Sequence, residues 1–183
     1  MNCFIRFTAL AFVLLHLAGC ASSSVVKLAN PVITGKPVSM DNIYVTTSSP
    51  LGDVVVEQHT LCDAIISGLN ETKMFPSVTA SKPADSSNGV IVNAEIRAIK
   101  KVSDRAREWS GALAGRARVL IRVTISDLNS GSQIEVFEAD GESGKAAFAG
   151  TTDEAIQRAA EQVVPKMLKL NADLADDKAA KLY

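Results

Sequence analysis

The sequence predicts an α+β protein with a mostly antiparallel sheet of about four to five strands and two helices packed on one face. Strand-like segments in which apolar and polar residues alternate cluster in the middle of the chain, over 90–141. Amphipathic helical segments lie on either side of this block, over 53–70 and 151–178. Strands that come as a block between helices favour an antiparallel sheet with the helices on one face.

The first elements follow from local composition. Residues 42–47 are rich in β-branched and aromatic side chains and are bounded by polar residues, which predicts a strand. Residues 53–70 are predicted to form a helix because apolar residues recur every four positions, at Leu61, Ile65 and Leu69. A short strand is predicted over 75–80, and the Ser-, Asp- and Pro-rich residues 81–89 are predicted to be a loop.

Two long segments show the period of two that is typical of half-buried strands. Residues 90–100 place one apolar set on a single face, namely Val90, Val92, Ala94, Ile96 and Ala98. Residues 116–127 alternate in the same way except at Leu120. The turn over 127–132 contains Gly131, placed for a positive φ, and predicts a hairpin with a return strand over 133–141. The polar faces of the long strands predict a sheet whose other side is in water.

The second helix is predicted over 151–178. Thr151 followed three residues later by Glu154 is a capping-box pattern, which marks a helix start. Pro165 lies inside the segment, and an interior proline kinks or breaks a helix. We therefore expect a bend or a restart near Val164.

The first residues have the layout of a secretory signal. Arg6 gives a charged start, residues 7–17 are almost all apolar, and small residues precede Cys20. The apolar run is shorter than the roughly 20 residues that a membrane-spanning helix needs. We expect a signal peptide over 1–19, a flexible tether over 20–40, a single α+β domain over 41–178 and a tail over 179–183.

The sequence Leu17-Ala18-Gly19-Cys20 resembles the lipobox of bacterial lipoproteins. The resemblance implies cleavage before Cys20 and a diacylglycerol on its sulfur, so that the chain contacts the membrane through this lipid. Residue 21 is Ala rather than Asp. In Gram-negative lipoproteins this implies the outer membrane, with the domain facing the periplasm.

The three cysteines divide into separate roles. Cys3 leaves with the signal peptide and Cys20 carries the lipid, so Cys62 has no partner for an intrachain disulfide. Cys62 lies in an apolar stretch and is predicted to be a buried thiol that packs as a small apolar group. A redox or intermolecular role is the alternative.

No catalytic, cofactor or metal site is predicted. His59 is the one histidine outside the signal peptide, and with Asp63 it supplies too few ligands for zinc. Ser110 lacks the G-x-S-x-G context of a hydrolase nucleophile, and residues 111–115 match neither the dinucleotide nor the Walker pattern. We therefore expect a protein that is not an enzyme.

A basic surface is the main candidate for binding. It consists of Arg97, Arg107, Trp109, Arg116, Arg118 and Arg122. Arginine and tryptophan are typical anchors of interfaces, and Arg suits anionic head groups. The alternative is a solvated face balanced by Glu95, Glu135 and Glu138. The net charge of −1 argues against a nucleic-acid binder.

The pattern of residues 107–127, the Asn129-Ser130-Gly131 turn and Gly150 before a capped helix resembles a family of bacterial lipoproteins with a domain of unknown function. The resemblance covers roughly residues 41–170. Ala149-Gly150 stands where that family usually has paired glycines. The layout is also similar to the TolB amino-terminal domain and to curli-assembly lipoproteins, which bind or scaffold.

These observations predict a lipid-anchored envelope protein that acts as a non-enzymatic binding or assembly module. Its partner would be another envelope protein or an anionic envelope polymer. One alternative is a periplasmic enzyme or ligand carrier with a pocket between helix and sheet. Another is a peptidoglycan- or anionic-lipid-binding protein.

Overall fold

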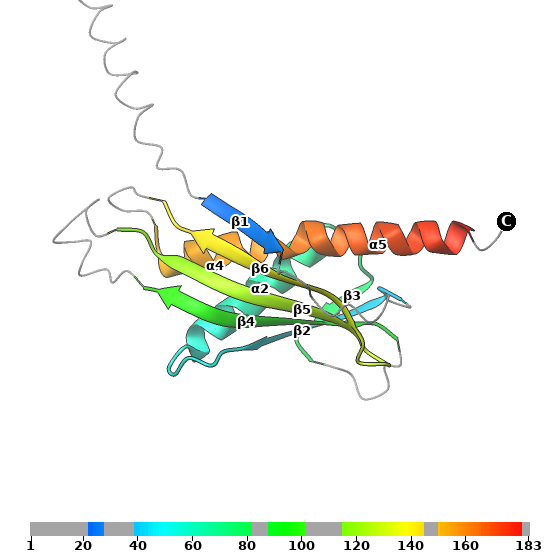
Figure 1. Ribbon diagram of the computed structural model, residues 1–183, viewed down its shortest axis with the longest axis horizontal. Helices are drawn as coiled ribbons and strands as arrows, with labels where there is room; N and C mark the ends of the chain where they lie inside the picture. The colour runs from blue at the N-terminus through cyan, green and yellow to red at the C-terminus, as the bar shows by residue number, and fades with distance from the viewer. Residues whose placement is uncertain (1–21, 28–38, 82–87, 102–114, 145–149, 181–183) are drawn as a thin grey trace, which may run out of the picture.

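The fold is one mixed sheet covered on one side by helices (Figure 1). The computed structural model describes residues 22–27, 39–81, 88–101, 115–144 and 150–180. The α+β class with a mostly antiparallel sheet is confirmed. The sheet has six strands, one more than the upper end of the predicted range.

The strand order is β1-β6-β5-β4-β2-β3. The strands are β1 (Ser22–Lys27), β2 (Asn42–Ser48), β3 (Ser77–Thr79), β4 (Val90–Lys100), β5 (Arg118–Asp127) and β6 (Gln133–Glu142). β4, β5, β6 and β1 pair antiparallel, and β5–β6 is the predicted hairpin. β2 runs parallel to both of its neighbours, β3 and β4. Gly131 in the β5–β6 turn has the expected positive φ, of 68°.

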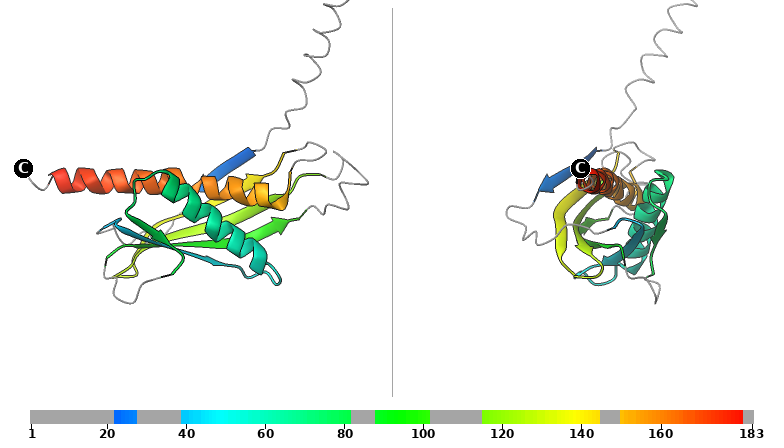
Figure 2. Two further views of the ribbon diagram at one scale, coloured as in Figure 1. Left: turned by 180° about the vertical axis from the view of Figure 1, so that it is seen from behind. Right: turned by 90° about the vertical axis from the view of Figure 1, so that its right-hand side faces the viewer.

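Three helical segments, α2 (Val55–Glu71), α4 (Thr152–Glu161) and α5 (Val163–Ala180), cover the same face of the sheet (Figure 2). Thr151 caps α4 as predicted, because its hydroxyl accepts a hydrogen bond from the Glu154 amide at 3.1 Å. The Glu154 carboxylate instead accepts from the Gly144 amide at 3.3 Å, so it ties the connection before α4 to the helix.

The predicted second helix is split in two, and the break lies at Gln162 rather than near Val164. Pro165 explains the position of this break. In a continuous helix the Glu161 carbonyl would need an N–H donor at residue 165, and proline has none. With α5 starting at Val163, Pro165 falls in the first turn, where no intrahelical donor is needed. α4 and α5 still run nearly in line (Figure 2).

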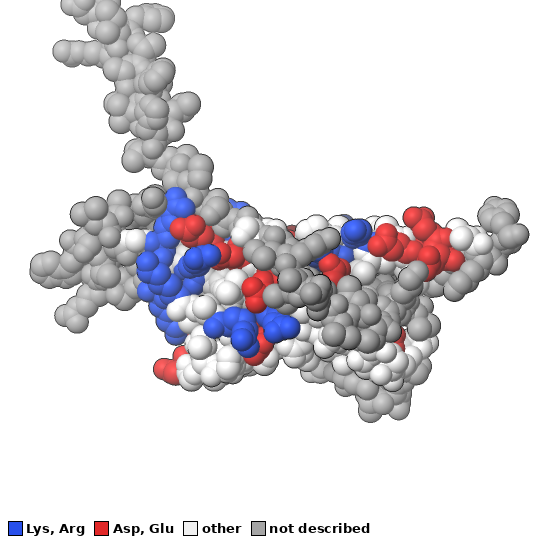
Figure 3. All heavy atoms as spheres, viewed as in Figure 1, with Lys and Arg blue, Asp and Glu red and all other residues white. Residues whose placement is uncertain are grey.

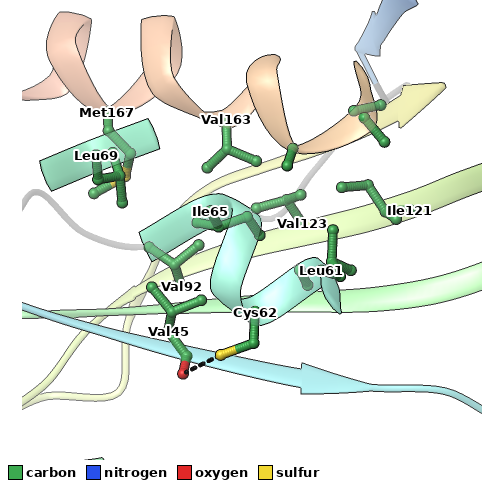
Figure 4. Close-up of a cluster of buried hydrophobic side chains, with 14 of the residues drawn as sticks. Val45, Leu61, Cys62, Ile65, Leu69, Val92, Ile121, Val123, Val163 and Met167 are labelled. Carbon is green, nitrogen blue, oxygen red and sulfur yellow. Dashed lines mark hydrogen bonds between the residues drawn. The ribbon is translucent and has the colours of Figure 1, made fainter. Parts of the chain in front are cut away.

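The core lies between the sheet and the helices (Figure 4). Leu61, Ile65 and Leu69 of α2 are fully buried against Val92 of β4 and Val123 of β5. The thiol of Cys62 is buried in the same layer and points at the Val45 carbonyl oxygen, 3.7 Å away (Figure 4). The structure therefore places Cys62 where a small apolar side chain is needed.

A bulge in β4 corrects one predicted core residue. The register with β5 shifts between Ile96 and Ala98, so Arg97 has no opposite residue. A bulge residue reverses which face the following side chains take. Ala98 is consequently exposed, and Ile99 packs against the core in its place.

The segment predicted as a tether contains an edge strand, so that prediction is wrong for Ser22–Lys27. β1 pairs along its whole length with β6, from Ser22 opposite Glu142 to Lys27 opposite Phe137. Residues 28–38 of the predicted tether, the signal peptide and residues 181–183 of the predicted tail lie outside the described residues. The rest of the predicted tail, Ala179 and Ala180, forms the end of α5.

The sheet face away from the helices, called the open face below, is only partly in water. Tyr44 lies between the core residues Ile43 and Val45 and therefore points to the open face, yet it is 2% exposed. Val136 of β6 lies opposite Thr124 outside the core cluster and is 5% exposed. The prediction of a fully solvated second face was therefore too simple.

Candidate functional site

The structure brings four of the predicted surface residues to the open face or its margin. Arg118 and Arg122 alternate along β5 with the core residues Val119, Ile121 and Val123, so they share the opposite face. The other two predicted members are Arg97 at the β4 bulge and Arg116 just before β5. Arg107, Trp109 and the predicted lipidation site Cys20 lie outside the described residues.

Most of these arginines are engaged by carboxylates. Arg118 binds Asp140 of β6 with two nitrogens, and its Nε lies 2.9 Å from both carboxylate oxygens. The hydrogen bond first, and the charge of Asp140 second, raise the pKa of Arg118 above its usual value. Arg116 Nη1 lies 3.1 Å from Glu142, and Arg97 Nη1 lies 3.1 Å from Glu95. These pairs resemble the alternative that the sequence left open, a face balanced by acids, with Asp140 and Glu142 acting beside the predicted Glu95.

Arg122 differs from its neighbours. It lies opposite Glu95 on one side and Glu138 on the other, but it makes no ion pair within 4.0 Å with either of them or with any other described residue. Its side chain is exposed in the middle of the open face. Among the predicted surface residues that the structure describes, Arg122 has its guanidinium most available to a partner.

Glu135, one of the three acids predicted to balance the arginines, lies on the other side of the sheet. Glu135 lies opposite Ile125 in register and so points to the helical side, where Lys166 of α5 binds it at 2.6 Å. The Lys166 ammonium also lies 5.3 Å from the centroid of the Phe137 ring. Glu135 shares this side with the core residues Phe137 and Ala139 by the ordinary alternation of β6. Glu135 therefore joins α5 to the sheet and does not balance the arginines.

Sequence reasoning missed Asp140 and Glu142 as the acids that pair with Arg118 and Arg116. Counting outward from the Gly131 turn would have placed Gly141 opposite Arg118, and the register shift after Ile125 brings Glu142 there instead. Lys101, in turn, binds Glu57 of α2 at 2.6 Å. Burial is the largest single effect and raises the pKa of Glu57, but the hydrogen bond from Lys101, a backbone hydrogen bond and the charge of Lys101 together outweigh it, so the pKa is lowered.

Figure 3 shows Lys and Arg side chains gathered toward one end of the open face, with acidic side chains between them. Lys100, Lys101, Arg116 and Arg118 lie at the end of the sheet at which β1 starts, where β4 ends and β5 begins. We call these four residues the basic end. Lys100 and Lys101 were not among the predicted site residues.

A groove of about 510 Å³ lies between α2 and the α4–α5 junction. It is lined by Ala64, Gly68, Glu71, Thr72, Gln157, Glu161, Val164, Pro165 and Leu168. A Cβ on Gly68 would lie 3.0 Å from Val164 Cγ2, so this glycine allows the two helices to approach closely. The groove is on the outside of the helical layer, whereas the alternative function had placed a pocket between helix and sheet.

His59 and Asp63 lie exposed on α2. Within the described ranges, no three side chains of His, Cys, Asp or Glu come close enough to hold a metal ion. No helix among the described residues is long and apolar enough to cross a membrane.

Solved structures share this fold. Two structures of the PelC dodecamer from Paraburkholderia phytofirmans have TM-scores of 0.52 and 0.50, with 10% and 9% identity. They cover 80% and 81% of this chain and 97% of the PelC chain in each case. A DUF330 protein from Xanthomonas campestris has a TM-score of 0.46 and 9% identity, covering 87% of this chain and 97% of its own. No curated protein matches the sequence.

Residues 55–147, about half of the chain, match the family model described as a domain of unknown function, DUF4410. The matched segment runs from the start of α2 to just beyond β6 and includes the β4–β5–β6 sheet. The expected resemblance to a domain of unknown function is thereby confirmed, whereas the similarity to TolB and curli-assembly modules stays a prediction. The chain belongs to the DUF4410 family.

Proposed function

We propose that this protein is a lipid-anchored envelope protein whose domain acts as a non-enzymatic binding or assembly module. In this proposal the chain is cleaved before Cys20, and the sulfur of Cys20 carries a diacylglycerol. The observation that carries it is the start of β1 at Ser22, only two residues after the lipobox cysteine. The sheet then begins directly after the proposed processing site.

Replacing Cys20 tests the anchor. Cys20→Ser is expected to abolish incorporation of labelled palmitate and to release the protein from the membrane fraction. Cys62→Ser is the matched control, because Cys62 is buried in the core and is not expected to carry lipid. Palmitate labelling of the Cys20→Ser variant at the wild-type level would contradict the proposal.

We assign the lipid to the outer membrane, with the domain in the periplasm, because residue 21 is Ala rather than Asp. Ala21→Asp is the variant that tests this sorting. The wild type should sediment with outer-membrane vesicles in a density gradient, and the variant should move to the inner-membrane fraction. A wild-type protein in the inner-membrane fraction would contradict the assignment.

Binding on the open face is supported by Arg122, which is exposed and lacks an ion-pair partner among the described residues. A photo-crosslinking residue at position 122 should capture an envelope partner in intact cells. The same residue at Asp63, exposed on α2 behind the sheet, is the control. Equal capture from both positions, or none from position 122, would contradict a role for the open face.

Self-assembly is the second candidate, because the PelC structures that share this fold are dodecamers. The acidic groove residue Glu71 and the basic residue Arg122 lie on opposite sides of the molecule. An acidic group on one side of the molecule and a basic group on the other can bind head to tail in neighbouring copies, and such contacts can close into a ring. Light scattering of the detergent-solubilised protein measures the mass. A ring should be lost in Glu71→Lys and regained on adding Arg122→Glu; a monomeric wild type would contradict assembly.

A further inference from the structure

One end of the sheet brings the start of β1 together with the basic end. Ser22 lies opposite Glu142, Glu142 lies opposite Arg118, and Arg118 lies opposite Lys100. These four residues therefore form a single row across β1, β6, β5 and β4. Arg116 is bound to Glu142 of the same row. The row marks the end of the sheet at which the chain enters the fold.

A lipid on Cys20 would hold this end close to the bilayer. Only Ala21 separates Cys20 from Ser22, and consecutive Cα atoms are about 3.8 Å apart. The Cα atoms of Cys20 and Ser22 are therefore separated by no more than about 8 Å. A flexible tether of some 20 residues, as the sequence predicted, would have left the domain free to rotate. The pairing of β1 with β6 removes that freedom.

Arg118 and Lys101 are more exposed than the acids that they bind, whereas Arg116 is less exposed than its partner Glu142, at 23% against 34%. The side chain of Arg118 is 62% exposed, whereas that of its partner Asp140 is 14% exposed. Lys101 is 49% exposed against 14% for Glu57. Lys100 is exposed as well and makes no ion pair with a described residue. A planar guanidinium paired through two nitrogens keeps further N–H groups for an anion. The side chains of Arg118, Lys101 and Lys100 are therefore cations that an approaching anionic surface can reach. Figure 3 shows basic side chains at this end with acidic ones among them.

The opposite end of the molecule is acidic. α4 starts beside the basic end, since the Ser143 hydroxyl donates to the Gly150 carbonyl and the Ser143 amide donates to the Ala117 carbonyl. From there α4 and α5 run away nearly in line, over about 40 Å at 1.5 Å per residue. The last turns of α5 carry Asp173, Asp176 and Asp177. Figure 3 shows acidic side chains gathered toward this end of the molecule.

We propose that the basic end docks against the membrane that holds the Cys20 lipid, where it binds anionic phospholipid headgroups and stands the domain end-on. The inference rests on the lipid anchor proposed above. The anchor holds the basic end beside the headgroups at a high effective concentration, so a weak electrostatic contact suffices to set the orientation. The acidic end of α5 then points away from the surface.

Energy transfer between α5 and the bilayer tests this orientation. The mature lipidated protein with Ala175→Cys, an exposed position on α5, is labelled with a donor and inserted into vesicles that contain a headgroup-labelled acceptor lipid. The buried Cys62 thiol has a raised pKa and should stay unlabelled. Transfer is expected to be low in vesicles containing phosphatidylglycerol and higher in pure phosphatidylcholine, because only the anionic surface orients the domain.

Charge reversal identifies the contact. Lys100→Glu changes the charge at the docked surface by two units, which should shift the ratio of end-on to tilted molecules by roughly 30-fold and raise the transfer. Lys169→Glu, exposed on α5, makes the same change in net charge and should leave the transfer low. Transfer that is equal in both lipids, or equally raised by both variants, would overturn the docking while leaving the anchor intact. Failure of the wild type to bind either vesicle would overturn the anchor and the docking together.

Discussion

Ser22 of β1 lies opposite Glu142 of β6, at the edge of the sheet and at the end where Arg116 and Arg118 are paired with acids. This pairing makes Ser22–Lys27, which the sequence predicted to be part of a flexible tether, part of the sheet. If Cys20 is the lipidated residue proposed above, only Ala21 separates it from the sheet.

The β1–β6 pairing predicts protection from hydrogen exchange. In an antiparallel edge strand, alternate amides bond to the neighbouring strand and the others face solvent. About half of the amides over Ser22–Lys27 should therefore exchange more slowly in the folded protein than in the urea-unfolded chain, measured by mass spectrometry of a peptide spanning β1. Exchange at the unfolded rate at every position would contradict the strand.

Gly141 of β6 is required for the approach of α4 to the sheet. A Cβ at this position would lie 2.0 Å from the Ala155 carbonyl oxygen and 2.5 Å from the Ala159 amide nitrogen. Backbone atoms cannot move aside as a flexible side chain can, so Gly141→Ala should lower the free energy of unfolding by about 3 kcal/mol, measured by urea denaturation. Gly52→Ala, which meets no atom within 4 Å, is the control and should be nearly neutral.

Thr151 stabilises the start of α4. Its hydroxyl satisfies the Glu154 amide, and loss of such a cap typically costs about 1 kcal/mol. Thr151→Ala should reduce the free energy of unfolding by that amount in urea, and Thr151→Ser should restore most of it. Equal stability of the Ala and Ser variants would show that the hydroxyl is not what caps the helix.

Cys62 should react slowly in the folded protein. Burial first, and the negative charge of Asp63 second, raise the pKa of its thiol. The folded state therefore binds this proton more tightly than the unfolded state, so the stability that Cys62 contributes is complete below about pH 8.5 and falls as the pH rises through that value.

The reactivity of the Cys62 thiol is measured by its rate of alkylation with iodoacetamide, followed by intact-protein mass spectrometry. At about pH 8.5, where an unperturbed thiol is half ionised, the rate in the folded protein should lie well below the rate in urea. Cys62→Ala should show a smaller loss of stability above that pH than the wild type. Equal alkylation rates with and without urea would contradict the burial.

The hairpin and the second helix could be predicted because their signals are local. Alternation over β5, the Gly131 turn and the cap at Thr151 each lie within a few residues, and the structure confirms all three. Pro165 predicted a break in the last helix, but the break lies three residues before it because helix geometry places proline in a first turn.

The remaining features depend on contacts between distant segments. β1 is a Ser-rich segment that becomes a strand because β6, more than 100 residues later, offers it an edge. The bulge at Arg97 exposes Ala98, which the alternation of β4 does not reveal. Glu135 lies on the helical side together with Phe137, but its partner Lys166 comes from a helix 31 residues later in the chain. The sequence therefore located the arginines of the open face without identifying Asp140 and Glu142 as their partners.

The proposed membrane anchor depends on the chemistry of Cys20. Mass spectrometry of the N-terminal peptide of the protein purified from membranes tests it. We predict that the mature chain begins at Cys20 and that this residue carries the added mass of a diacylglycerol. A chain that begins elsewhere, or an unmodified Cys20 in the mature protein, would contradict the lipid anchor and the membrane docking that rests on it.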